Sequence, residues 1–355
     1  MRKILATFCF LAIVGTPVAF SQESSRAALL LERFFGPTRE ASARRALLKE
    51  TMVPEIVDTS HAAGLGFTKS VREPYAVIPG YSLPVPSKNQ LEVDVCFLSD
   101  AECAGRASGT PGYSAAAMYV YRRFSDSGLH TFERSFDADG VPGHNIIGER
   151  QRPQARKWII IMARLDGVGD HDGKRFPGAD ANASGVASLL SLADSSSELA
   201  PAYNLMFAAI DGHHRSMSGA EDLYRLLDMR GIGRRDVQMV INIEEIGSCL
   251  SPVIKGWKSY ILMLGGEPYE EMFWRSNAGI SLHLNYDYYG SSSFTDLFYR
   301  KASDQKAFLN RGFPCVMFTS GITMNTNRPE DTPSTLDYGI LGRRVELIRR
   351  WVGML

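Results

Sequence analysis

An alternation of fully apolar segments with amphipathic segments constrains the fold of this chain more than any other feature. Four continuous apolar runs predict buried strands, at 158–166, 204–211, 237–243 and 314–320. Segments with an apolar face at helical spacing predict helices, at 184–194, 218–229, 268–276 and 334–355. Buried strands that alternate with helices form a largely parallel sheet. We therefore predict an α/β fold of three layers, with a mostly parallel central sheet and helices on both faces. A capping box of Ser218 and Glu221 is predicted at the start of the second helix.

The charge balance narrows the range of partners. The chain has 355 residues, 39 of them basic and 39 acidic, so its formal net charge is +0. A surface without a basic excess disfavours nucleic acid and anionic membranes as partners. We therefore expect a peptide or a small molecule as the ligand.

The N-terminus carries the signature of an export signal. A short basic start is followed by an apolar stretch and by small residues up to Ser21, which predicts a signal peptide at 1–21 and a secreted or periplasmic protein. Residues 22–93 are interpreted as an N-terminal extension packed on the main domain, and 94–355 as the α/β domain. No membrane span is expected in the mature chain, and a retained anchor is the alternative for 1–21.

The cysteines give no clear functional signal. Cys96 and Cys103 are close enough in sequence to pair in an oxidising compartment, and their spacing leaves the pairing open. Cys249 and Cys315 read as core or strand-end residues.

Polar residues gather where the predicted strands end. They are Asp166, Asp180, His213, His214, Glu244, Glu245, Asn327, Glu330 and Asp331. In open α/β sheets, ligands bind beyond the carboxyl ends of the strands. Two adjacent histidines at such a position indicate a metal site or acid–base chemistry.

Several motifs follow one another in a characteristic order. They are PGADANASG at 177–185, INIEEIG at 241–247, SDQKAF at 303–308 and NRPEDT at 327–332. This series resembles the secreted zinc exopeptidases with two co-catalytic metals, clan MH, which include aminopeptidases and have glutaminyl cyclases as relatives. The resemblance covers roughly residues 94–345 and implies the same three-layer fold.

The resemblance also shows which site residues have changed. In that family His and carboxylate ligands hold two zinc ions around a shared Asp, and a Glu acts as general base. Asp180 matches the shared Asp. The remaining family positions are occupied by Arg164 with Asp166 in the first motif, by His213 in place of the base, and by His214, Glu244, Gln305 and Asn327 in the later motifs.

The altered residues predict a changed metal centre. The first metal position would be lined by Arg164, Asp180 and Glu244, with Glu244 facing inward and Glu245 facing the opposite side. A guanidinium cannot ligate a metal but can bind two carboxylates. We interpret Arg164 as a built-in cation that replaces the first metal.

The second metal position would be lined by Asp180, His214 and Asn327. This set offers one carboxylate, one imidazole and a weak amide oxygen. No cofactor is expected, and a single loosely held zinc remains the alternative.

Two functions follow from this interpretation. The first is a non-catalytic pseudopeptidase that binds peptide ends or another small ligand. The second is an active metallo-aminopeptidase or amide hydrolase with one zinc on Asp180 and His214, and with His213 as the base. The sequence leaves open whether the protein is an enzyme.

Overall fold

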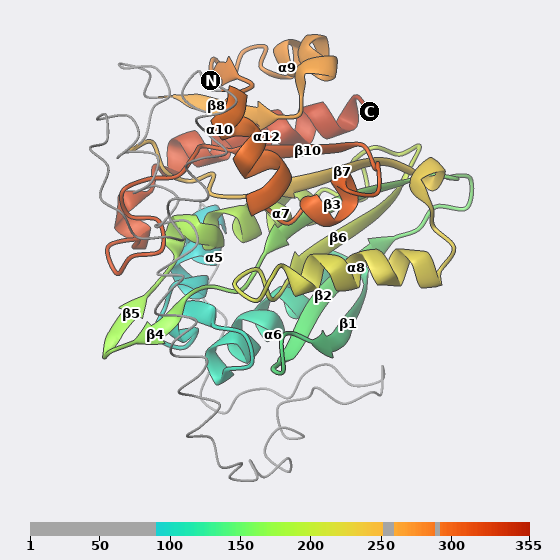
Figure 1. The fold of residues 1–355 in the computed structure, drawn as a ribbon. Coiled ribbons are helices and arrows are strands. Elements are labelled where there is room, and N and C mark those ends of the chain that lie inside the picture. The colour runs from blue at the N-terminus through green and yellow to red at the C-terminus, as the bar shows by residue number, and fades with distance from the viewer. Residues whose placement is uncertain (1–89, 251–258, 288–291) are drawn as a thin grey trace, which may run out of the picture. The chain divides into compact units, whose positions relative to one another are not determined.

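The computed structural model describes residues 90–250, 259–287 and 292–355 (Figure 1). The predicted signal peptide at 1–21 and nearly all of the predicted extension at 22–93 lie outside these residues. The proposed boundary at residue 94 falls within the first described helix, α5 (Gln90–Leu98).

An eight-stranded sheet forms the centre of the described part, in the order β1-β2-β6-β3-β7-β10-β8-β9. The strands are β1 (His130–Asp137), β2 (Pro142–Arg150), β3 (Trp158–Arg164), β6 (Asn204–Ile210), β7 (Val237–Ile243), β8 (Tyr260–Leu264), β9 (His283–Asn285) and β10 (Cys315–Thr319). A separate hairpin consists of β4 (Gly169–His171) and β5 (Lys174–Phe176). All four predicted strands are present, and their ends shift by two residues at most.

The middle of the sheet is parallel and its flanks are mixed. β6, β3, β7 and β10 pair in parallel, and β9 pairs in parallel with β8. β1, β2 and β8 join their inner neighbours antiparallel. The predicted α/β fold with a mostly parallel central sheet is therefore confirmed.

Helices cover both faces of this sheet. The α-helices after α5 are α6 (Pro111–Asp126), α7 (Ser184–Asp194), α8 (Ser218–Met229), α9 (Glu270–Ser276), α10 (Ser292–Leu297), α11 (Lys306–Leu309) and α12 (Tyr338–Gly353). Short turns of 3-10 or π type are η1 (Ala104–Arg106), η2 (Ala179–Ala183), η3 (Arg234–Asp236), η4 (Glu267–Tyr269), η5 (Phe298–Ala302) and η6 (Pro333–Thr335).

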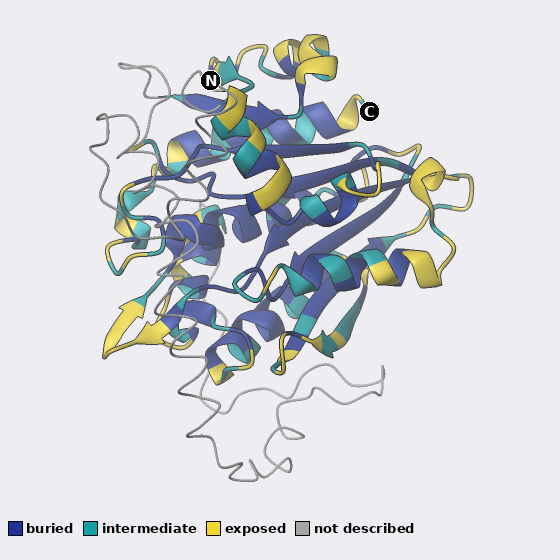
Figure 2. Cartoon of the chain, in the orientation of Figure 1, coloured by how far each residue is buried: buried dark blue, intermediate teal, exposed yellow. Residues whose placement is uncertain are grey.

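Successive residues of the central strands point to opposite faces and so build two apolar cores. Ile159 and Ile161 of β3 join the core that contains side chains of α5, α6, α7 and α12. Ile160 and Met162 join the other core, under α8 and α11. Full burial of one such side chain contributes about 1.5–3 kcal/mol. In Figure 2 the central strands are accordingly buried, whereas the β4–β5 hairpin is exposed.

The structure settles two local expectations within the described part, the start of α8 and the state of two cysteines. The predicted capping box is wrong, because Ser218 is already the first residue of α8, and Met217 precedes it in a left-handed conformation without a side-chain cap. Glu221 pairs with Arg311 at 2.8 Å instead. The question of a Cys96–Cys103 disulfide resolves to free thiols.

None of the helices in the described residues is long and apolar enough to cross a bilayer. The carboxyl ends of β3, β6, β7 and β10 meet at one edge of the sheet because these strands run in parallel. The polar residues singled out in the sequence follow these strand ends.

Candidate functional site

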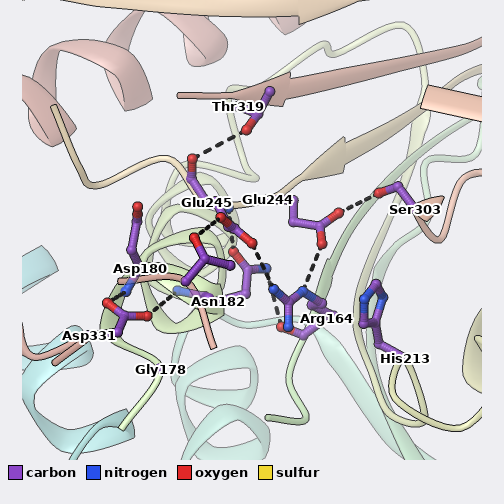
Figure 3. Close-up of polar contacts among 12 residues, drawn as sticks. Arg164, Gly178, Asp180, Asn182, His213, Glu244, Glu245, Ser303, Thr319 and Asp331 are labelled. Atoms are coloured by element: carbon purple, nitrogen blue, oxygen red, sulfur yellow. Dashed lines mark hydrogen bonds and ion pairs between the residues drawn. The ribbon is translucent and has the colours of Figure 1, made fainter. Parts of the chain in front are cut away.

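Arg164, the last residue of β3, lies at the centre of a buried charged cluster (Figure 3). Its Nε donates to Glu244 Oε1 at 2.8 Å, and its Nη2 donates to Glu245 Oε1 at 3.1 Å. The three side chains are 1–2 % exposed. β3 and β7 are parallel neighbours, so their ends bring the arginine and both glutamates together. The guanidinium therefore bridges two carboxylates.

The two glutamates follow β7 directly, and both turn toward the same guanidinium. Glu245 has a φ of 49°, in the left-handed region that interrupts the alternation of a strand. Ser303 donates to Glu244 Oε2, and Thr326 donates to Glu245 Oε2 at 2.9 Å. The expectation that Glu245 faces away from Glu244 is wrong, because the left-handed turn places both carboxylates on Arg164.

The cluster holds more negative charge than one guanidinium balances. Burial opposes the charged form of Arg164, but Glu244 and Glu245 outweigh it and raise the pKa of the guanidinium. Burial raises the pKa of Glu245 well above its ordinary value; Arg164 opposes this rise, and Asp180 and Glu244 reinforce it. Of the two bridged carboxylates, Glu245 is thus driven toward its protonated form.

The histidine pair follows β6 and is fixed through Asp166. The backbone N–H groups of His213 and His214 donate to the two oxygens of the Asp166 carboxylate at 3.0 and 3.1 Å. His213 Nδ1 lies 2.7 Å from Asp304 Oδ2, and both side chains are buried. His214 Nε2 lies 3.5 Å from Arg164 Nη1. The structure therefore brings Arg164, Asp166 and both histidines together.

The pKa values of the two imidazoles are shifted in opposite directions. Burial lowers the pKa of His213, but the Asp304 carboxylate outweighs burial and the nearby Arg164, so the pKa lies above its ordinary value. Burial together with His213 and Arg164 lowers the pKa of His214 well below its ordinary value. A neutral Nε2 on His214 offers its lone pair to the guanidinium, which can only donate.

Asp180 lies in the turn η2 and binds the loop after β7. Its Oδ1 accepts from the N–H groups of Gly247 at 2.7 Å and Ser248 at 3.2 Å, and from the Ser184 hydroxyl at 3.1 Å. Its Oδ2 is buried and has no hydrogen-bond partner within the described residues. Burial raises the pKa of Asp180, against these hydrogen bonds. The second carboxylate on Arg164 thus comes from Glu245 instead of the predicted Asp180.

The turn around Asp180 is held by further buried polar groups. Asp331 accepts from the N–H groups of Asp180 and Ala181 at 2.8 and 2.9 Å. Asn182 accepts from Glu245 N at 2.8 Å and is 1 % exposed. A Cβ on Gly185 would lie 2.3 Å from Asn182 Oδ1, which explains the glycine at the start of α7. The Asn-Ala-Ser sequence is accordingly part of this turn and not an exposed glycosylation site.

Two other predicted site residues have different surroundings. Gln305 is buried, accepts from Asn242 Nδ2 at 2.8 Å and donates to Tyr299 O at 2.7 Å. Asn327 lies half-buried in the loop after β10 with a φ of 56°. Gln305 therefore contacts the cluster indirectly. It binds Asn242, and Asn242 also donates to Glu244 Oε2 at 3.3 Å.

Three contributors to the site were missed by the sequence analysis. They are Asp304, which pairs with His213, and Ser303 and Thr326, which bind the two glutamates. Ser303 and Asp304 directly precede Gln305 in the motif at 303–308, so this motif could have pointed to both residues. Thr326 precedes Asn327 by one position, and only the loop geometry shows that it reaches Glu245.

Comparison with known families identifies the scaffold. The profile of peptidase family M28 matches residues 145–352, more than half of the chain. The chain belongs to peptidase family M28. The resemblance inferred from the motifs is thereby confirmed.

Individual relatives of this M28 protein are distant. The alkaline phosphatase isozyme conversion protein of Escherichia coli is 28% identical over 163 residues, which are 40% of this chain and 47% of that protein. The chain spans about half the length of the curated relatives that it matches.

Solved structures share the fold at low identity. A zinc aminopeptidase from Bacillus subtilis has a TM-score of 0.61 at 13% identity, with 77% of this chain and 95% of that chain covered. A glutaminyl cyclase from Fimbriiglobus ruber has a TM-score of 0.61 at 16% identity, with 78% and 98% covered.

The residues of this M28 protein do not fit a centre of two zinc ions. A zinc ligand must offer a lone pair, and the Arg164 guanidinium has none to offer. It binds the carboxylates of Glu244 and Glu245 itself. Across 90–250, 259–287 and 292–355, no group of three or more His, Cys, Asp or Glu side chains is placed to hold a metal ion.

Proposed function

We propose that this M28 protein is a non-catalytic member of its family, which uses the peptidase fold to bind a peptide end or another small ligand without zinc. The observation that carries the proposal is the buried bridge from Arg164 to Glu244 and Glu245. It supplies a fixed positive charge from the protein itself, in a cluster of carboxylates.

The same bridge argues against hydrolysis by the guanidinium itself. Hydrolysis of an amide needs donors aimed at the oxygen on which negative charge develops. Nε and Nη2 of Arg164 are aimed at its own glutamates, and Nη1 faces His214 at 3.5 Å. The arginine is also only 1 % exposed. Its donors are therefore engaged inside the protein.

A second function is favoured by one observation. Asp180 Oδ2 is buried and has no hydrogen-bond partner among the described residues. Such an atom is costly unless a proton or a cation satisfies it. A metallo-aminopeptidase or amide hydrolase with a single zinc at Asp180 is the alternative that this atom supports.

An activity assay separates the two functions, with a variant that lacks the Asp180 carboxylate as the control. Purified wild type and Asp180→Ala are incubated with a panel of aminoacyl-nitroanilides, with added zinc and with a chelator. The proposal predicts the same residual turnover for both proteins under all conditions. Wild-type turnover at least about tenfold above Asp180→Ala and abolished by the chelator would establish the hydrolase.

We also propose that the protein is exported. The basic start and apolar stretch within residues 1–21 support a secreted or periplasmic location. N-terminal sequencing of the exported protein is expected to begin at Gln22. Recovery of the full N-terminus from the membrane fraction would favour the anchor.

A further inference from the structure

We propose that the end of the sheet opposite the candidate site docks on an anionic lipid surface, with the phosphate-bearing head groups of a bilayer as the partner. The contact is peripheral and needs no membrane-spanning segment. It is independent of the proposed function, and it leaves the site facing away from the surface. We call this region the basic end, and it consists of the loops that precede the parallel strands, 151–157, 195–203, 230–236 and 310–314.

A formal net charge of zero, which by itself disfavours an anionic membrane as partner, conceals a separation of charge along the sheet. The loops of the basic end carry seven Arg and Lys side chains against two acidic ones, Glu198 and Asp236. In Figure 1 these loops lie on the right, where α8 ends, and the β4–β5 hairpin lies on the left.

The described segments that follow the same strands form the opposite end of the sheet. They carry nine acidic side chains against four basic ones. These segments are 165–183, 211–217, 244–250 and 320–332. Because the central strands are parallel, the two groups of loops lie at opposite edges. The fold therefore gives its two ends formal charges of opposite sign.

The cations of the basic end lie on neighbouring loops. β3 and β7 are paired, and Lys157 Nζ, just before β3, donates to Gln238 Oε1 at 3.2 Å. Arg234 reaches the loop before β10, because a Cβ on Gly312 would lie 3.2 Å from Arg234 Nη1. Three of the four loops thus present one continuous basic surface.

Three of these cations are available to a partner. Arg156, Arg234 and Arg235 are exposed, and none of them binds an acidic side chain among the residues that the structure describes. Arg311 is exposed as well and pairs with Glu221 at 2.8 Å. An exposed cation without a fixed partner is attracted to an anionic surface within a Debye length, about 8 Å at physiological salt.

An exposed apolar side chain accompanies the cations and favours lipid as the partner. Met229, the last residue of α8, is 73 % exposed and directly precedes Arg230. Asp228 lies on its other side, so the excess of positive charge comes from the loops as a group. At membrane interfaces, cations meet the head groups while apolar side chains enter the acyl boundary. Cations spread over several loops also suit a surface of many charges better than a single small anion.

Vesicle sedimentation tests the proposal. The purified protein is mixed with vesicles of phosphatidylcholine, alone or with about 30 % phosphatidylglycerol, at about 0.05 M and about 0.5 M salt. We expect binding that requires the anionic lipid and is lost at the higher salt concentration. Binding that persists at the higher salt concentration, or that phosphatidylcholine alone supports, would indicate an apolar contact and would contradict the proposal.

A matched pair of charge reversals locates the contact. Arg234→Glu with Arg235→Glu reverses two exposed charges at the basic end and is expected to weaken binding by at least about tenfold. Lys174→Glu with Arg175→Glu reverses two exposed charges on the β4–β5 hairpin and changes the net charge equally. This control is expected to stay within about twofold of wild type. Met229→Ser is expected to weaken binding about threefold.

Three results would overturn the inference. One is the absence of binding to vesicles that contain the anionic lipid. Another is equal weakening by the reversals at the two ends, because net charge would then govern binding. The third is binding to immobilised polyglutamate without binding to vesicles, which would assign the basic end to an acidic polypeptide. Circular dichroism and Tm verify that each variant is folded, and the substituted side chains are all exposed.

Discussion

Two fully buried arginines, Arg164 and Arg344, solve the burial of a positive charge in different ways. Arg164 ends β3 and binds two carboxylates. Arg344 lies on α12 and binds three backbone carbonyls at 2.7–2.9 Å. Carbonyl dipoles satisfy a guanidinium without adding charge, whereas carboxylates add a charge that in turn needs the arginine. The comparison shows that equal burial does not imply an equal role.

The carbonyl-bound arginine has a clear structural task. It holds the carbonyls of Ile246 and Ser248, in the segment whose N–H groups bind Asp180. From α12, Arg344 therefore fixes the backbone of residues 246–248 next to the site. Arg164 instead holds the two glutamates that follow β7.

The sharpest test of this difference is charge rescue. Arg164→Met is expected to lower the free energy of unfolding by about 3–5 kcal/mol, because Glu244 and Glu245 stay buried without their cation. Addition of Glu244→Gln and Glu245→Gln is expected to restore at least half of that loss. Denaturant unfolding of the single and triple variants measures both effects. A triple variant no more stable than Arg164→Met would break the comparison.

Arg344→Met is expected to cost somewhat less, about 2–4 kcal/mol, because it leaves carbonyls that lose charged hydrogen bonds. The same Glu244→Gln and Glu245→Gln changes are expected to give no rescue in this background. Denaturant unfolding measures the loss, and a rescue like that seen with Arg164→Met would show that the two arginines are equivalent.

Asp211 is a buried carboxylate that is bound by neutral donors, and its titration makes the stability of the fold depend on pH. Asp211 follows β6 and accepts from Ser108 Oγ at 2.6 Å, Gly212 N at 2.7 Å and His144 N at 3.0 Å. Burial, reinforced by nearby Asp166, raises its pKa to about 7. The folded pKa lies above the unfolded one, so the stability from the protonated form is present below about pH 4 and is lost as the pH rises through about 7.

Asp211→Asn removes this titration. The amide offers one acceptor fewer to these donors, which costs stability at every pH; as the pH rises from 4 to 8, the unfolding free energy of the variant relative to that of wild type is expected to increase by about 1–3 kcal/mol. Urea unfolding across that range gives the difference. Parallel pH profiles for the two proteins would contradict the assignment.

The smallest expected effect concerns the imidazole at the rim. Asp304→Asn removes the carboxylate that outweighs burial and Arg164 at His213. The pKa of His213 is expected to fall below its ordinary value, at a cost in unfolding free energy of about 1–2 kcal/mol at most. An NMR titration of the imidazole protons follows the change. An unchanged titration would show that Asp304 does not control His213.

The sequence predicted the layers well and the inner contacts less well. The apolar runs at 158–166 and 237–243 correctly predicted β3 and β7, because strands that are buried on both faces are apolar along most of their length. The partner of Arg164 was predicted only in part. Glu244 was expected, but a left-handed residue at Glu245 reversed the direction that strand alternation implied. Backbone geometry of this kind leaves no signature in residue spacing.

The measurement that tests the central claim most directly is anomalous diffraction at the zinc edge, from crystals of the wild-type protein grown with excess zinc. The account predicts continuous density for the Arg164 guanidinium between Glu244 and Glu245, and no anomalous peak in the cluster. An anomalous peak in contact with Asp180, His214 or Glu244, with the guanidinium displaced, would contradict it.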